Sequence, residues 1–162
     1  MAILADYVDI INTMDYQAQF EIVNLQSWIE LMPNYEQIIR NMSQNEYLRI
    51  TRNDLYTLGQ NIQNNNNYDN LVYEFIIKVL MWGYPTRSRL SRWIVNNNNY
   101  ILNICECIVE SENYNEFVCA FNEVNSLGQS TYTKFLHFLQ IENDDHFKCQ
   151  ILDNNIRAIL NS

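Results

Sequence analysis

Residues that interrupt secondary structure are scarce in this chain, and that scarcity limits its fold more than any other feature. Only three glycines and two prolines occur among 162 residues. All-β proteins turn every few residues and need many more of both. Apolar residues make up 48% of the chain, which is too many for a disordered protein. We therefore predict an all-α fold, a single compact helical domain over residues 1–162, with N-terminal helices in 1–70 and a second helical part in 71–162.

Apolar side chains recur at intervals of three and four residues, the spacing that lines one face of an α-helix. The most apolar segment, Leu71 to Trp82, is predicted to be a central helix that ends at Gly83-Tyr84-Pro85. Two tetra-asparagine runs are predicted to lie in loops. The other helices are predicted over 3–14, 20–32, 34–42, 51–59, 100–109, 114–124, 135–141 and 154–160.

Two segments have the residue types that start helices. Ser43 and Glu46 have capping-box spacing, which predicts a helix whose apolar side includes residues 47–50. The segment from Thr51 to Asp54 predicts the cap of a further helix, with Gly59 at its C-terminal end.

Acidic residues outnumber basic ones, and the formal net charge is −9. Proteins that bind DNA through its phosphates usually carry a basic face. The window between Glu74 and Glu106 differs, because it contains no acidic residue. Its basic residues are Lys78, Arg87, Arg89 and Arg92. This pattern predicts one basic patch on an acidic body; segment 86–93 is either a solvated loop or a phosphate contact.

The sequence predicts neither a membrane protein nor a metal protein. No apolar run approaches the roughly 20 residues of a membrane span, and the N-terminus lacks the basic flank of a secretory signal. The cysteine spacing fits no standard zinc site and is typical of free thiols in a cytoplasmic protein. No phosphate loop or paired-histidine motif occurs, so no metal and no cofactor is expected. The cysteines are Cys105, Cys107, Cys119 and Cys149.

The segment after Gly128 combines a turn with the start of a helix. Gly128 breaks the preceding helix, and residues that favour helix starts follow it. Lys134 is then the first charged residue on a helix whose other residues are mostly large and apolar. Two interpretations are open: a surface lysine whose amine reaches solvent, or an amine placed for chemistry.

Asp153 follows the apolar pair Ile151-Leu152 and precedes a short helical pattern, so it is predicted to cap the last helix. An amine near a helix N-terminus in apolar surroundings is biased toward its neutral, nucleophilic form. A nearby carboxylate stabilises a developing cation. Lys134 and Asp153 are therefore a candidate catalytic pair if the fold places them across one cleft, although Asp153 also fits a purely capping role.

The Gly128 turn, the Thr-Lys at 133–134 and the Ile-Leu-Asp at 151–153 resemble the helix-hairpin-helix DNA glycosylase superfamily. They are most similar to uncharacterised bacterial relatives of 8-oxoguanine DNA glycosylase. The segment Met-Trp-Gly-Tyr-Pro-Thr at 81–86 is also similar to those relatives, and the resemblance covers roughly residues 75–160. The superfamily hairpin usually reads Leu-Pro-Gly-Val-Gly, whereas this chain has a single glycine there.

The resemblance implies an enzyme that flips a modified base of the 8-oxoguanine type out of DNA. It implies that Lys134 forms a Schiff base with glycosylase and AP lyase chemistry, and that Asp153 stabilises the sugar cation. DNA contacts are then expected at Gly128, Ser130, Thr131, Thr133, Arg87, Arg89 and Arg92, and a base pocket at His137, Trp82 and Phe138. For the histidine and the aromatic residues, core packing is the alternative interpretation.

A different function class remains open beside the enzyme. The acidic balance and the missing hairpin glycines favour a non-catalytic helical module that binds a protein partner or regulates, for example in bacterial antiphage defence. The presence of Lys134 and Asp153 favours the enzyme. The salt dependence of duplex binding distinguishes the two classes.

Overall fold

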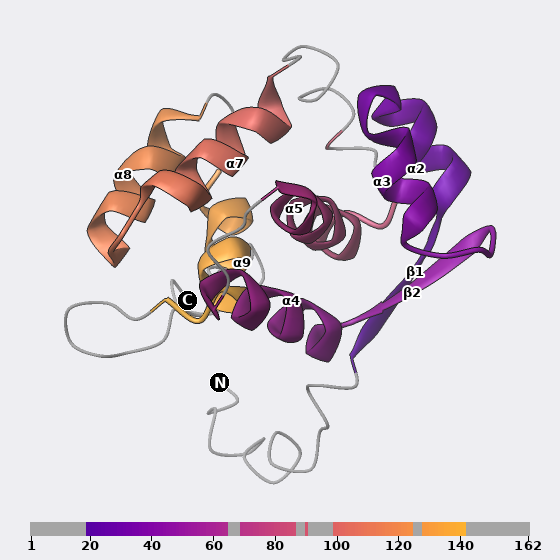
Figure 1. Ribbon diagram of the computed structural model, residues 1–162, viewed down its shortest axis with the longest axis horizontal. Helices are drawn as coiled ribbons and strands as arrows, with labels where there is room; N and C mark the ends of the chain where they lie inside the picture. Colours follow the sequence, from indigo (N-terminus) through magenta and orange to yellow (C-terminus); the bar gives the residue numbers. More distant parts are fainter. Residues whose placement is uncertain (1–18, 65–68, 87–89, 91–98, 125–127, 142–162) are drawn as a thin grey trace, which may run out of the picture.

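The computed structural model describes residues 19–64, 69–86, 90, 99–124 and 128–141 (Figure 1). Most of these residues are helical, which confirms the predicted fold class, and the only sheet among them is a two-stranded ribbon. In chain order the elements are β1 (Phe20–Asn24), α2 (Leu25–Leu31), the 3-10 turn η3 (Pro33–Tyr35), α3 (Glu36–Asn41), β2 (Tyr47–Thr51), α4 (Arg52–Asn64), α5 (Asp69–Gly83), α7 (Tyr100–Glu110), α8 (Tyr114–Glu123) and α9 (Gln129–Phe138). The helix predicted over 3–14 lies outside the described residues.

The ribbon of β1 and β2 corrects two helix predictions. The helix predicted over 20–32 is wrong in its first part, and residues 47–50 also form a strand. The strands pair antiparallel, with Val23 opposite Leu48. Both are rich in aromatic and β-branched residues, which fit a pleated surface. Val23 and Ile50 are buried against the core, so tertiary packing selects the strand over the helix.

The predicted capping box at Ser43 does not start a helix. The Ser43 hydroxyl accepts a hydrogen bond from the Asn45 N–H, which closes a tight turn. Glu46 instead accepts a hydrogen bond from the Asn24 side chain at 2.8 Å across the ribbon. Asn24 also caps α2, because its side-chain oxygen accepts from the Ser27 N–H.

The second predicted cap is confirmed at the start of α4. Thr51 and Asp54 form a reciprocal capping box, because each side chain accepts a hydrogen bond from the other residue's backbone N–H. The predicted end at Gly59 is wrong, since α4 continues to Asn64. Gly59 lies instead where the backbone of Phe138 approaches α4: a Cβ there would lie 2.9 Å from the Phe138 carbonyl carbon.

The helix α5 lies near the centre of the molecule, with α7 and α8 on one side and α2 and α3 on the other (Figure 1); α4 and α9 also pack against it. This confirms the central helix predicted from Leu71 to Trp82. Phe75, Ile76 and Leu80 are fully buried in it. Burial of one such side chain contributes about 1.5–3 kcal/mol. The buried apolar residues form one cluster that extends from β1 to the end of α9.

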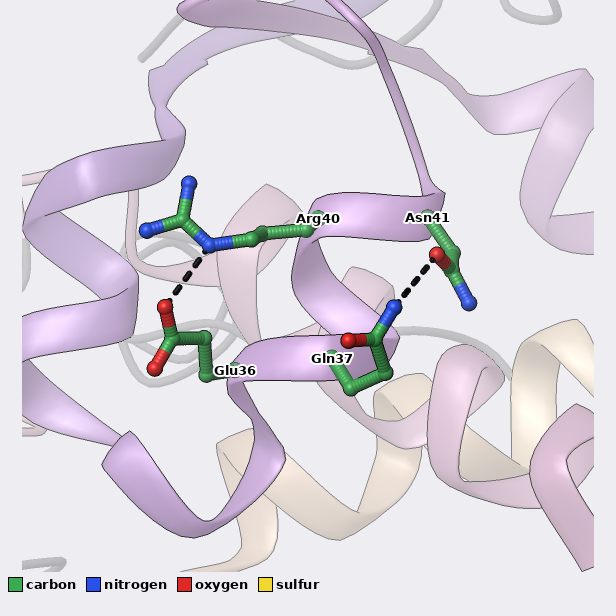
Figure 2. A network of polar contacts seen from close by, with 4 residues as sticks. All are labelled: Glu36, Gln37, Arg40 and Asn41. Carbon is green, nitrogen blue, oxygen red and sulfur yellow. Dashed lines mark hydrogen bonds and ion pairs between the residues drawn. The ribbon is translucent and has the colours of Figure 1, made fainter.

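The outer face of α3 is polar and is stabilised within the helix itself. Figure 2 shows the two pairs: Arg40 with Glu36 at 2.7 Å, and Gln37 with Asn41 at 3.0 Å. Both are i,i+4 pairs on a solvent-exposed surface, where each contributes a few tenths of a kcal/mol, ~0.3–0.5. The opposite face of the helix carries Ile39, which is fully buried in the core. Within the described ranges, no helix has both the length and the apolarity to cross a bilayer.

Candidate functional site

The side chain of Lys134 is buried between α9 and the end of α5. Only 7% of the residue is exposed. Its Nζ atom donates a hydrogen bond to the Ser130 carbonyl oxygen at 2.5 Å and lies 3.3 Å from the Ser130 hydroxyl oxygen. The amine therefore points back toward the first turn of α9. This geometry excludes the interpretation of Lys134 as an exposed surface lysine.

The last residue of α5 and the residue after it form the wall opposite the lysine. A Cβ at Gly83 would lie 3.0 Å from the Lys134 Cδ atom and 3.1 Å from its Cε atom. The Tyr84 ring lies beside the amine, with its centroid 5.5 Å from Nζ. The Tyr84 hydroxyl shares a hydrogen bond with the Thr131 hydroxyl at 2.5 Å. Two segments about 50 residues apart in sequence thus enclose one amine.

The first turn of α9 carries the residues predicted to contact DNA. Gly128 is the N-cap; no side-chain hydrogen bond caps the helix, and a Cβ at Gly128 would meet nothing within 4 Å. The Gly128 carbonyl oxygen accepts from the N–H groups of Thr131 and Tyr132. The N–H groups of Gln129 and Ser130 precede these bonds in the first turn, where an α-helix offers its N–H groups no partner within the helix. Such groups at a helix N-terminus favour an anion.

The predicted hydroxyl contacts differ in their exposure. Ser130 is half-buried and follows the exposed Gly128 and Gln129. Thr131 is 1% exposed and bonded to Tyr84. Thr133 is 3% exposed, and its hydroxyl donates to the Gln129 carbonyl oxygen at 2.8 Å. A phosphate contact at either threonine would therefore require the break of an internal hydrogen bond.

The three residues predicted to form a base pocket lie together. Trp82 and Phe138 make an edge-to-face contact with ring centroids 5.4 Å apart, and the His137 ring contacts Phe138. Two residues of α4 that the sequence did not indicate complete the cluster. Arg52 donates to the Nε2 atom of His137 at 2.7 Å, and the Tyr56 hydroxyl bonds the same nitrogen.

These contacts hold the His137 ring in place from the side of α4. A guanidinium only donates hydrogen bonds, so the Nε2 atom of His137 is the acceptor in its contact with Arg52. The Arg52 guanidinium also lies 5.7 Å from the Trp82 ring centroid and 6.0 Å from that of Phe138. The Nε atom of Arg52 and the indole N–H of Trp82 are buried without a partner in the described part of the chain. In sequence, Arg52 and Tyr56 show only as an i,i+4 pair, and nothing there indicates their partner 81–85 residues away.

Several predicted site residues lie outside the described residues, namely Asp153, Arg87, Arg89 and Arg92. Cys149 does as well.

Over the described ranges, no group of three His, Cys, Asp or Glu residues could hold a metal ion. Burial raises the pKa of Cys107 to about 11, and burial also raises the pKa of Cys105.

Comparison with known protein families shows to which family the chain belongs. The family described as "Putative 8-oxoguanine DNA glycosylase OGG-like protein" matches residues 14–162. The chain belongs to this OGG-like family. The match extends well beyond the resemblance at 75–160, since it includes the β1–β2 ribbon and the helices around it. No curated protein and no solved structure matches the chain.

Membership places the site in a DNA glycosylase-like protein. Lys134, the first turn of α9 and the cluster of Trp82, His137 and Phe138 all lie in the matched region. The helix-hairpin-helix motif itself stays a prediction: α8 and α9 are present, but residues 125–127 between them lie outside the described part.

Proposed function

We propose that this protein is a DNA glycosylase and AP lyase that acts on a flipped modified base of the 8-oxoguanine type, with Lys134 as the nucleophile. One observation carries the proposal: the amine of Lys134 is held inside the protein at the first turn of α9. Burial disfavours the charged form of an amine and favours the nucleophilic one. Family membership supplies the class of substrate.

In this proposal the neutral amine of Lys134 leaves its hydrogen bond with Ser130 and attacks C1′ of the flipped nucleotide. The new N–C1′ bond forms as the glycosidic bond breaks, and the bonding electron pair leaves with the base, which takes up a proton. Loss of a proton from nitrogen and opening of the sugar ring lead to a Schiff base. Elimination then removes a proton from C2′ and expels the 3′-phosphate. Asp153 stabilises the positive charge that develops on the sugar.

The proposed DNA contact is local, because the whole chain is acidic. The N–H groups of Gln129 and Ser130 bind a backbone phosphate, aided by the partial positive charge of a helix N-terminus, about half an elementary charge. Gly128 leaves open space in which the phosphate approaches the backbone. The basic segment with Arg87, Arg89 and Arg92 supplies further phosphate contacts.

The proposed base contacts come from the cluster of Trp82, His137 and Phe138. Trp82, which is half-buried, offers an aromatic wall, and the fully buried Phe138 supports it through their edge-to-face contact. His137 lies beside this wall, and its ring would line the proposed pocket. Arg52 and Tyr56 hold the ring in place through their hydrogen bonds to Nε2.

Borohydride trapping tests the nucleophile. The wild-type protein is incubated with duplexes that carry 8-oxoguanine, an abasic site or no lesion, and the Schiff base is reduced to a covalent adduct. We expect an adduct with the lesion duplexes that Lys134→Gln abolishes. Lys78→Gln is the matched control, because Lys78 is a lysine of α5 paired with Glu74 and lies outside the proposed site. An adduct that survives in Lys134→Gln, or none with either lesion, contradicts the proposal.

The net charge of −9 favours a second candidate, a non-catalytic protein-interaction or regulatory module, for example in bacterial antiphage defence. Duplex binding measured from low to physiological salt separates the two. The enzyme binds at low salt, with an affinity that falls as salt rises. An absence of binding at low salt, together with an absence of adduct, supports the module.

A further inference from the structure

We propose that Gly83 and Tyr84 are positioning residues that hold the Lys134 amine at the first turn of α9 and stabilise positive charge on its nitrogen. The geometric part stands on the described contacts, whereas its catalytic consequence rests on the proposed function. The sequence predicts a base-pocket role for Trp82 of α5, but it predicts no contact between α5 and Lys134.

The backbone does not require glycine at position 83. Glycine often follows or ends a helix because it adopts a positive φ without strain. No described glycine of this protein has a positive φ. The contact with Lys134 gives the reason instead, since a Cβ at 3.0 and 3.1 Å from Cδ and Cε is closer than ordinary van der Waals contact. A side chain at position 83 would push the lysine stem away from α5.

Tyr84 is fixed to both helices that enclose the amine. Its backbone N–H donates to the Leu80 carbonyl oxygen at 2.9 Å, which continues the hydrogen-bond pattern of α5. Its hydroxyl is bonded to Thr131 in the first turn of α9. The ring is therefore held at one distance from the amine, 5.5 Å from centroid to Nζ.

That ring opposes the effect of burial on the amine. The face of an aromatic ring attracts a cation within about 6 Å. Burial favours the neutral amine, so the ring limits how far the ammonium form is destabilised. In the proposed reaction the same nitrogen becomes a cationic iminium. The ring then stabilises this intermediate at the position where it forms.

The first test follows the amine itself and needs no DNA. The 15N resonance of each lysine Nζ is titrated by NMR in protein with 15N-labelled lysine, and Lys134→Gln assigns the Lys134 signal. In Tyr84→Leu we expect the titration midpoint of Lys134 to fall by about half a pH unit, because the cation loses its ring. In Gly83→Ala we expect a changed chemical shift and midpoint, because the amine moves.

Internal controls guard against a general effect of substitution. The Lys78 signal reports on a lysine of the same helix paired with Glu74, and it should titrate as in wild type. Tyr73→Phe removes a hydroxyl from α5 at a ring that packs on Tyr35, so it should leave the Lys134 signal unchanged. Tyr84→Phe keeps the ring, so the titration midpoint of Lys134 should stay close to its wild-type value. A Lys134 titration identical to wild type in both Gly83→Ala and Tyr84→Leu overturns the proposal.

The second test measures the catalytic consequence. In single-turnover trapping on abasic duplex, Gly83→Ala should lower the adduct-forming rate at least tenfold, because the amine moves. Tyr84→Leu should lower it about threefold, in line with the expected shift of the midpoint. Both should shift the pH profile of the rate, with duplex affinity within twofold of wild type. Unchanged rates contradict the catalytic part. If wild type forms no adduct, the proposed function fails, while the NMR titration still decides whether Gly83 and Tyr84 position the amine.

Discussion

Each of the three glycines has a different environment, although the sequence shows only that they are few. Gly59 lies against the backbone of Phe138, Gly83 lies against the side chain of Lys134, and Gly128 faces open space. The first permits two helices to approach, the second permits a lysine to be buried, and the third leaves the start of α9 accessible. Their substitution should therefore have different effects.

Gly59→Ala is expected to destabilise the protein by about 2–3 kcal/mol or more, because the new Cβ would overlap the Phe138 carbonyl group and force α4 and α9 apart. Urea unfolding followed by circular dichroism measures the loss. Gly128→Ala is the matched control: φ is −70° and a Cβ meets no atom within 4 Å, so stability should change by less than about 0.5 kcal/mol. Equal effects of the two substitutions would refute this interpretation.

At the scale of elements, two stretches with the same capping pattern have different structures. Thr51 and Asp54 start α4 as expected. Ser43 and Glu46 have the same spacing, yet a strand follows them. The difference lies in what comes next, since residues 47–50 alternate between core and surface and find a partner in β1. A cap stabilises a helix only where the residues that follow it can pack against the core in a helical conformation.

Thr51→Ala should therefore destabilise the protein by about 1 kcal/mol, because the Asp54 N–H loses its acceptor at the start of α4. Ser43→Ala is the comparison: it removes only the bond from the Asn45 N–H in a turn, and we expect about 0.5 kcal/mol or less. Chemical denaturation of both variants measures the difference. A larger loss in Ser43→Ala would show that the turn, and not the α4 cap, limits stability.

At the scale of the whole molecule, the core contains ionisable groups that the fold keeps neutral. The Tyr100 hydroxyl is buried without a hydrogen-bond partner in the described part, and burial raises the pKa of Tyr100 well above its usual value of 10.0. Burial likewise raises the pKa of Cys107 from 9.0 to about 11. Both groups are neutral when protonated, so the folded state resists their ionisation.

The contribution of these two groups to stability should consequently be constant well below pH 9 and fall above it. The unfolded chain ionises Cys107 above pH 9 and Tyr100 above pH 10, whereas the folded protein holds both protonated, so rising pH favours unfolding. Urea unfolding from pH 7 to 11 measures this slope. Tyr100→Phe should reduce the slope and leave stability at pH 7 equal or higher, because the unpaired hydroxyl is gone. The exposed Tyr47→Phe should keep the wild-type slope, and an unchanged slope in Tyr100→Phe would contradict the assignment.

The sequence by itself determined the helical class, the central helix, the cap of α4 and the candidate lysine, because these depend on local propensity and on apolar spacing within one segment. Tertiary structure decided the β1–β2 ribbon, the bonds from Arg52 and Tyr56 to His137, and the burial of Lys134 against Gly83 and Tyr84. Each of these joins residues more than 20 positions apart. Such contacts form only when packing brings the segments together, and no periodicity within a segment encodes its partner.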